Sequence, residues 1–261
     1  MNFFKRINPQ KHFKNISSEA GLDRTNGFWN CLSSGDLDND GDLDYVVGNH
    51  GLNTRFKASQ KKPLFMLVNN FDLNTTVSQI ICVYNGDEAY PIALRNDLVR
   101  QMPGLKNKYP LYSNYKEQKI EDIFTEEQIR TSARSFIYTT QTSIAWNNGN
   151  GTFDIESLPV EAQFAPVYGI SVNDYDLDGN PDILLGGNFY HAKPVVGIYD
   201  ASYGLMLKGD GMGRFTPLSA RKSGFLVKGE IRDFLQVDVN GADLIMVARN
   251  NDSILFYKNL E

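Results

Sequence analysis

Two short stretches of the chain carry acidic side chains at a spacing that could bind a metal ion. The stretch at 36–44 reads DLDNDGDLD, and the stretch at 174–182 reads DYDLDGNPD. Aspartates at alternate positions of a tight turn direct their carboxylates toward one centre, and calcium takes about six to eight oxygen ligands. Gly41 and Gly179, at the sixth position, allow the sharp turn. Because carboxylates this close repel one another without a cation, the pattern favours a bound divalent ion.

The candidate ligands of the two stretches occupy equivalent positions, with an offset of 138 residues from Asp36 to Asp174. The first candidate calcium site comprises Asp36, Asp38, Asp40, Asp42 and Asp44. The second comprises Asp174, Asp176, Asp178, Asn180 and Asp182. Asp42 and Asn180 would each contribute a backbone carbonyl, and the other residues would contribute side-chain oxygens. A solvated acidic turn is the alternative, but two copies in the same phase favour two Ca²⁺ sites.

The EF-hand begins with the same acidic spacing, but it needs a bidentate glutamate at its twelfth position and a helix on each side. The twelfth position here is Val47 in one stretch and Leu185 in the other, and neither side chain can bind a metal. The stretches continue into YVVGN and ILLGGN, which are too short for a helix and rich in strand-forming residues. We therefore expect each ion to lie between two strands.

The elements around these stretches also repeat. Glycine-rich segments at 147–153 (NNGNGTF) and 209–215 (GDGMGRF) are typical of tight hairpins. Weaker copies of the acidic stretch occur at 70–78 (NFDLNTTVS) and 238–250 (DVNGADLIMVARN). Internal repeats of this kind indicate a propeller or a solenoid. We expect an all-β, β-propeller-like fold of about four blades, complete or part of a larger ring, in a single domain spanning 1–261.

Residues 95–134 interrupt the strand pattern with the apolar spacing of helices. Thr125 and Gln128 have the spacing of a capping box, and Ser113 is a second candidate N-cap. We expect a helical insertion within one blade. It is either a solvated excursion without a function or a docking element for a partner.

Composition narrows the possible functions. A hydrophobic content of 41%, with 16 Phe and 13 Tyr, is sufficient for a core built from strands. A net charge of −5 without a basic run gives no electrostatic footprint for nucleic acid. No apolar run reaches the roughly 18 residues of a membrane-spanning helix, and the N-terminal stretch MNFFKRINPQKHFKNISSEAG lacks the hydrophobic region of an export signal. Cys31 and Cys82 lie in apolar, strand-like surroundings, which favour buried thiols over a disulfide.

The sequence contains no nucleophile elbow, zinc-binding histidine pair or phosphate-binding loop. His50 and His191 each follow the strand after an acidic stretch, so they are either a paired site or two unrelated loop histidines. The glutamates outside the acidic stretches, Glu88, Glu156, Glu161 and Glu230 among them, follow no catalytic pattern. We expect a protein that is not an enzyme, with a polysaccharide-acting lyase or hydrolase as the alternative.

The acidic stretches with their exit strands, DLDNDGDLDYVVGN and DYDLDGNPDILLGGN, resemble the calcium loops of FG-GAP/VCBS repeats, which are β-propeller blades also found in integrin α chains. The segments ISSEAGLDRTNGFWN, GNHGLNTRFKAS, EAQFAPVYGI and YDASYGLMLKGDG are similar to the C-terminal part of large bacterial VCBS proteins of the ASPIC/UnbV-associated kind, common in Bacteroidetes. The resemblance covers nearly the whole chain, from residue 12 onward.

The resemblance implies a β-propeller with calcium in its blade loops and an extracellular, cell-surface or periplasmic location. It also implies a role in adhesion or as a scaffold, with a glycan or a protein as the ligand. The chain departs from the family in length, in the lack of a signal peptide, and in showing fewer blades than integrin-type propellers. A partial propeller would expose strand edges and associate with the missing blades or with other surface proteins.

Overall fold

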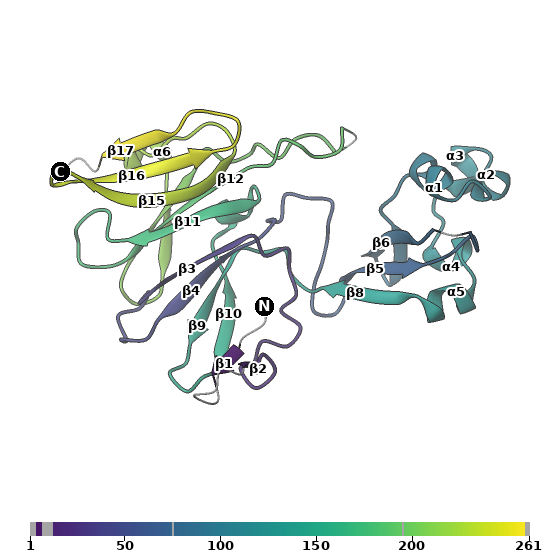
Figure 1. The fold of residues 1–261 in the computed structure, drawn as a ribbon, viewed down its shortest axis with the longest axis horizontal. Helices are drawn as coiled ribbons and strands as arrows, with labels where there is room; N and C mark the ends of the chain where they lie inside the picture. Colours follow the sequence, from purple (N-terminus) through teal and green to yellow (C-terminus); the bar gives the residue numbers. More distant parts are fainter. Residues whose placement is uncertain (1–3, 7–12, 75, 195, 259–261) are drawn as a thin grey trace. The chain divides into compact units, whose positions relative to one another are not determined.

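The computed structural model describes residues 4–6, 13–74, 76–194 and 196–258. This part of the chain is mostly strand, and every strand pairing in it is antiparallel, which agrees with the expected all-β class (Figure 1). The chain divides into two compact units, one formed by 1–54 with 140–261 and the other by 55–139. Among the described helices, none is long and apolar enough to cross a membrane.

The unit formed by 1–54 and 140–261 contains three meander sheets. Sheet 1 consists of β3 (Cys31–Gly35), β4 (Asp44–Gly48), β9 (Ser143–Asn147) and β10 (Phe153–Ser157). Sheet 2 consists of β11 (Val167–Asn173), β12 (Asp182–Gly187), β13 (Leu205–Gly209) and β14 (Phe215–Leu218). Sheet 3 consists of β15 (Ile231–Val239), β16 (Ala242–Arg249) and β17 (Leu255–Lys258). In each sheet the strands lie side by side in chain order.

Shorter elements complete this unit. The strands β1 (Phe4–Arg6) and β2 (Phe13–Asn15) pair with each other, η1 (Val160–Gln163) precedes sheet 2, and α6 (Ala220–Ser223) precedes sheet 3.

The three sheets pack on one another in chain order. The first strand of sheet 2, β11, packs against the first strands of both neighbouring sheets, β3 and β15. Ile183 and Leu185 of β12 belong to the core shared with sheet 1, whereas Leu184 belongs to the core shared with sheet 3. This alternation follows from the two-residue period of a strand, and each such burial contributes about 1.5–3 kcal/mol. Both faces of β12 are therefore buried, as its continuous apolar sequence indicates.

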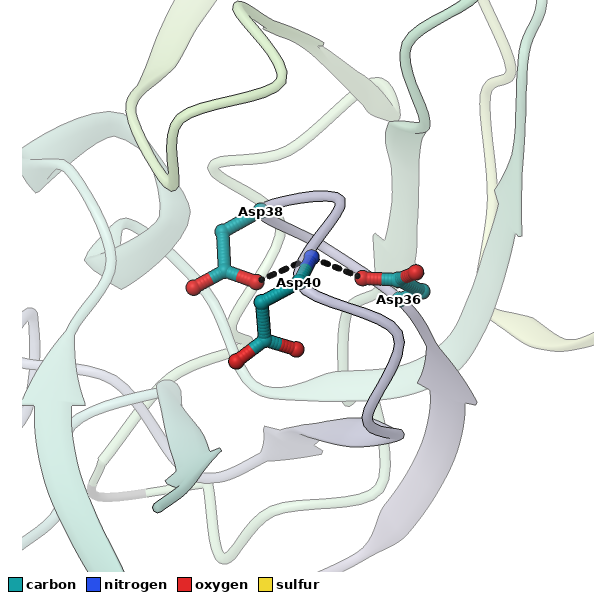
Figure 2. A group of neighbouring side chains, drawn as sticks. All are labelled: Asp36, Asp38 and Asp40. Atoms are coloured by element: carbon teal, nitrogen blue, oxygen red, sulfur yellow. Dashed lines mark hydrogen bonds between the residues drawn. The ribbon is translucent and has the colours of Figure 1, made fainter. Parts of the chain in front are cut away.

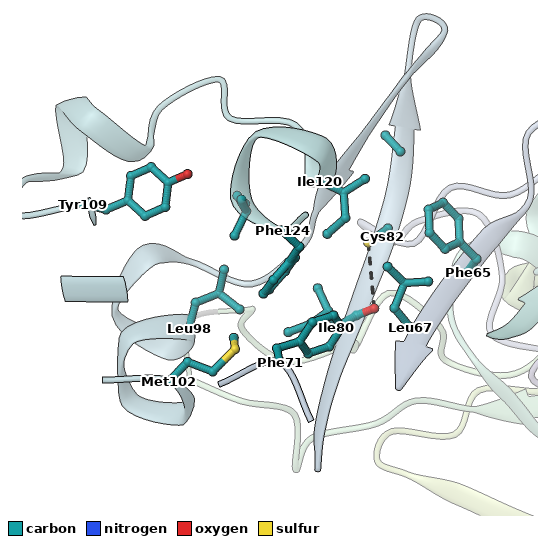
Figure 3. Close-up of a cluster of buried hydrophobic side chains, with 12 residues drawn as sticks. Phe65, Leu67, Phe71, Ile80, Cys82, Leu98, Met102, Tyr109, Ile120 and Phe124 are labelled. Carbon is teal, nitrogen blue, oxygen red and sulfur yellow. Dashed lines mark hydrogen bonds between the residues drawn. The ribbon is translucent and has the colours of Figure 1, made fainter. Parts of the chain in front are cut away.

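The unit formed by 55–139 has a sheet of its own, built from β5 (Leu64–Asn69), β6 (Ser78–Asn85), β7 (Glu88–Pro91) and β8 (Ala133–Ile137). Five short helices lie between β7 and β8: α1 (Arg95–Gln101), α2 (Leu105–Lys108), α3 (Tyr112–Tyr115), α4 (Ile120–Ile123) and α5 (Glu126–Thr131). Figure 3 shows their apolar side chains, including Leu98, Ile120 and Phe124, against Leu67 and Ile80 of the sheet. The helices and this sheet share one core.

Two sequence expectations for the helices had different outcomes. The Thr125–Gln128 capping box is present, with the Gln128 N–H donating to Oγ1 of Thr125 at 3.3 Å and the Thr125 N–H donating to Oε1 of Gln128 at 2.9 Å. The expectation that Ser113 caps a helix was wrong, because Ser113 lies inside α3 and Leu111 occupies the N-cap position.

The strand order in the 55–139 sheet differs from that of the meander sheets. Its order is β7-β6-β5-β8, so the last strand returns to pair with the first, which is the Greek key arrangement. The weak acidic copy at 70–78 does lie in the turn region between β5 and β6. Sequence similarity in that turn therefore did not indicate the topology of the sheet that contains it.

Cys31 and Cys82 are both free thiols, in β3 and β6 respectively. Burial raises the pKa of each thiol to about 12. The buried-thiol interpretation is therefore confirmed for Cys82, whereas Cys31 is half-buried.

Candidate metal sites

Each of the two complete acidic stretches forms the turn between the first two strands of a meander sheet. The first turn, 36–43, joins β3 to β4, and the second, 174–181, joins β11 to β12. The equivalent residues Asn39 and Leu177 both adopt the left-handed conformation, with φ of 60° and 59°, and the two glycines follow with φ of 93° and 89°. The chain therefore builds the same turn twice, flanked by strands and not by the helices of an EF-hand.

The first aspartate of each turn organises the backbone. Asp36 accepts hydrogen bonds from the N–H of Asp40 at 3.0 Å and of Gly41 at 3.1 Å. Figure 2 shows the Asp40 nitrogen between the carboxylates of Asp36 and Asp38, at 3.3 Å from the latter. The equivalent bonds of Asp174 measure 3.1 and 2.8 Å. These aspartates hold the turn closed and direct the next carboxylates toward one another.

The seventh residue of each turn donates its backbone N–H to the carboxylate of the fifth residue. The N–H of Asp42 donates to Asp40 at 2.8 Å, and the N–H of Asn180 donates to Asp178 at 2.9 Å. The side-chain oxygen of Asn180 accepts a hydrogen bond from Asn39 at 3.2 Å, so it is engaged by the neighbouring turn. The main-chain role expected for Asp42 and Asn180 stays a prediction.

The aspartate at the ninth position of each acidic stretch, which is the first residue of the strand after the turn, is fully buried: Asp44 is 1% and Asp182 0% exposed. It is called the ninth aspartate below. Asp44 accepts from the N–H of Leu37 at 3.1 Å and from the N–H of Asn147 in β9 at 2.8 Å. Asp182 makes the equivalent bonds with Tyr175 and with Gly209 of β13, at 3.0 and 2.9 Å. Burial raises the pKa of both carboxyls, and the neighbouring aspartates raise it further, against the lowering effect of these N–H donors. The ninth aspartate thus ties the turn to the third strand of its sheet.

Carboxylate oxygens gather in both turns. In the first turn, oxygens of Asp36, Asp38 and Asp40 lie within 4.8 Å of one another. In the second, the group is Asp174, Asp176 and Asp182, so its third member is the buried aspartate at the ninth position and not the equivalent of Asp40. Burial and the charges of its neighbours raise the pKa of Asp38. Such oxygens are the ligands that hard cations such as Ca²⁺ take, and a cation would offset their mutual repulsion. The donor chemistry of both turns therefore fits a hard divalent ion.

One residue that contacts the second turn from a neighbouring strand was not predicted from the sequence. Nζ of Lys208, in β13, contacts a carboxylate oxygen of Asp176 and lies 2.8 Å from Oδ2 of Asp178. These hydrogen bonds raise the pKa of Lys208 and lower that of Asp178. An ammonium group thus pairs with two of the candidate ligands of the second turn. Aligning the hairpins WNNGNGTF and KGDGMGRF makes Lys208 equivalent to Trp146, but it does not indicate the contact of Lys208 with the turn.

The two turns are neighbours in space. Nδ2 of Asn39 in the first turn donates to the side-chain oxygen of Asn180 in the second at 3.2 Å, and to the carbonyl oxygen of Gly211 at 3.4 Å. Both candidate sites therefore lie at the same end of the stacked sheets.

The histidines considered as a pair have different surroundings. The ring of His50 packs on Phe28 and Tyr199, with ring centroids 5.6 and 4.9 Å away, and burial lowers the His50 pKa. His191 is exposed, and its Nδ1 lies 3.7 Å from Glu230. The geometry gives no support to a paired histidine site.

Glu230 is the buried carboxylate that the sequence pattern did not single out. It accepts from the N–H of Tyr190, from Arg232 and from Asn250, each at 2.7 Å. Burial would raise the Glu230 pKa, but these donors outweigh it and hold the pKa below its ordinary value. Both carboxylate oxygens of Glu230 therefore accept hydrogen bonds. Through Tyr190 and Asn250, Glu230 connects the start of β15 to the segments that follow β12 and β16.

A scan against protein-family models and a search of curated proteins returned no match for this chain. The resemblance to FG-GAP/VCBS repeats is therefore carried by the sequence motifs alone.

Proposed function

We propose that the unit formed by 1–54 and 140–261 is a non-catalytic, calcium-stabilised module for binding or scaffolding, built from blades of the FG-GAP/VCBS type. The observation that carries the proposal is the repeated turn. Two turns 138 residues apart share residue spacing, backbone conformation, internal hydrogen bonds and a buried ninth aspartate. A solvated acidic turn has no need of this repeated set of converging carboxylates.

Calcium is supported by the chemistry of the donors. The side chains are all carboxylates, the turns are short, and neither turn offers the soft sulfur or imidazole ligands that zinc and copper take. Extracellular calcium modules work at high ion concentrations, so such sites would fill at the cell surface or in another exported location. This agrees with the location that the resemblance implies.

The propeller arrangement is supported by how the meander sheets pack. Consecutive antiparallel sheets lie face to face, with their first strands adjacent along the stack, as the blades of a propeller do. The sheet within 55–139 has a different strand order, so the proposal assigns three blades to this chain. Further blades, from the same polypeptide or from another, would complete a ring. A glycan or a protein is the class of ligand we propose for such a surface.

The calcium proposal is tested by thermal unfolding of protein freed of metal with a chelator. Because an ion that binds only the folded state stabilises it, we expect the Tm to fall on chelation and to recover with CaCl₂. Asp38→Asn and Asp176→Asn should each give part of this loss, and Asp87→Asn, an exposed aspartate of the other unit, should not. An identical melting curve with and without CaCl₂ would overturn the proposal.

A further inference from the structure

The two turns share a backbone conformation but differ in the residue at one equivalent position of the third strand of each sheet. Asn147 and Gly209 are equivalent, because each donates its N–H to the ninth aspartate of its turn. The residues just before them are therefore also equivalent: Trp146 in sheet 1 and Lys208 in sheet 2.

These two residues interact with different groups. The indole N–H of Trp146 donates to Glu156 at 2.9 Å, within its own hairpin. In the described part of the chain, no lysine or arginine forms an ion pair with the gathered carboxylates of the first turn, Asp36, Asp38 and Asp40. Lys208, by contrast, bonds both Asp176 and Asp178 of the second turn. One acidic group lacks a protein cation and the other has one.

A lysine ammonium and a divalent ion compete for the same carboxylates. The ammonium is a compact charge with three donors on a flexible stem, so it can both occupy this place and leave it. A calcium ion that binds the Oδ2 atoms of Asp176 and Asp178 would displace Lys208 from them. Calcium binding at the second turn therefore includes the loss of these ion pairs, and binding at the first turn has no equivalent step.

We propose that Lys208 is a built-in competitor for the metal, so that the two turns fill in order, the first at lower calcium and the second at higher calcium. This inference rests on the proposed calcium function. At low calcium Lys208 offsets part of the negative charge of the second turn through its ion pairs with Asp176 and Asp178. At high calcium the ion displaces the ammonium, which is then free to face solvent.

The first experiment is calorimetric titration of the metal-free full chain with CaCl₂. We expect wild-type protein to show two sites of unequal Kd, and Lys208→Met to tighten the weaker site by about tenfold or more. Lys208→Arg, which keeps the charge, should leave the weaker site weak. Lys62→Met is the matched control, because Lys62 is also ion-paired to an aspartate, Asp87, but in the other unit. Asp176→Asn with Asp178→Asn should remove the weaker site and so assign it.

The second experiment compares thermal unfolding of the same proteins. Without calcium, Lys208→Met should lower the Tm, because the carboxylates of the second turn lose their cation. At saturating CaCl₂ the difference should vanish or change sign. If Lys208 only formed an ordinary surface ion pair, Lys208→Met would lower the Tm by the same amount with and without CaCl₂. A Tm difference that disappears or changes sign with CaCl₂ therefore indicates competition.

The outcomes separate the two proposals. If none of these proteins binds calcium, the proposed function fails and the inference fails with it. If wild-type protein binds two ions with equal Kd, or if Lys208→Met leaves the weaker Kd within about twofold, calcium binding stands and the role of Lys208 is overturned. A variant that folds only with CaCl₂ supports the inference.

Discussion

The aspartates of the two turns hold the backbone of the turn and are also the candidate ligands of the ion. Asp36 and Asp174 at the first position, and Asp44 and Asp182 at the ninth, accept backbone N–H groups. Each such bond contributes about 0.5–1.5 kcal/mol net, and more when the acceptor is charged. The fold of the turn therefore relies on the same carboxylates that would bind the ion, which couples metal binding to stability.

Glu230 gives a residue-scale expectation for the effect of pH. Its pKa is held below the ordinary value of 4.5 in the folded protein. A carboxyl with a lowered folded pKa stabilises the protein above its unfolded pKa, and this stabilisation is lost as pH falls through the folded value. The charged groups facing it are Arg232 at 2.7 Å and, when protonated, His191 at 3.7 Å.

We expect Glu230→Gln to lower the free energy of unfolding at pH 7, because the amide cannot supply the charge that Arg232 pairs with. The difference from wild type should shrink as pH falls below 4.5. Urea unfolding at a series of pH values measures it. A difference that stays constant across this range would show that the charge of Glu230 is not what stabilises the fold.

At the scale of elements, close approach of sheets 2 and 3 depends on a residue without a side chain. A Cβ at Gly186 in β12 would lie 2.5 Å from Cγ2 of Ile231 and 2.7 Å from Cζ of Phe234. Both neighbours are buried core residues of β15, so they have little room to move.

Gly186→Ala should therefore lower the free energy of unfolding by about 1–3 kcal/mol. Gly104→Ala is the matched control, because a Cβ there meets nothing within 4 Å and its φ is −58°. That variant should be neutral or slightly stabilising. Equal stability of the two variants in urea unfolding would mean that sheets 2 and 3 pack less closely than described.

At the scale of the whole molecule, the unit at 55–139 is inserted between adjacent strands of sheet 1. The strands before and after it, β4 and β9, pair directly with each other. The segments by which the chain leaves and re-enters the larger unit are also hydrogen-bonded to each other. The N–H of Gly51 donates to the carbonyl oxygen of Thr140 at 2.7 Å. The larger unit therefore closes its own sheet across the insertion.

We expect that replacing 55–139 with a short Gly-Ser linker leaves the larger unit folded. Calcium stabilisation, if present in the full chain, should persist in the shortened chain, because both acidic turns lie outside the deleted residues. Circular dichroism and thermal unfolding with and without CaCl₂ measure this. Loss of the folded state in the shortened chain would mean that sheet 1 requires the inserted unit.

The local features of this protein could be predicted from its residues and their spacing. The alternating aspartates, the glycine at the sixth position and the apolar exit segments predicted two turns between strands, and Thr125 with Gln128 predicted a helix start. These features depend on hydrogen bonds that span only a few residues, such as Asp36 to Gly41. The residues that make such bonds are close in sequence, so their spacing is sufficient to indicate them.

Contacts between residues far apart in the chain could not be predicted in this way, because they depend on how the strands and sheets are arranged. The pairing of β5 with β8, the contact of Lys208 with Asp176, and the hydrogen bonds of Tyr190 and Asn250 to Glu230 join residues 20 to 73 positions apart. In each case the neighbours are set by how strands pair and sheets stack, and residue spacing along the chain carries no record of that pairing. The two acidic turns can therefore be recognised in the sequence, but the contact of the Lys208 ammonium with one of them is found only when β13 is placed beside β12.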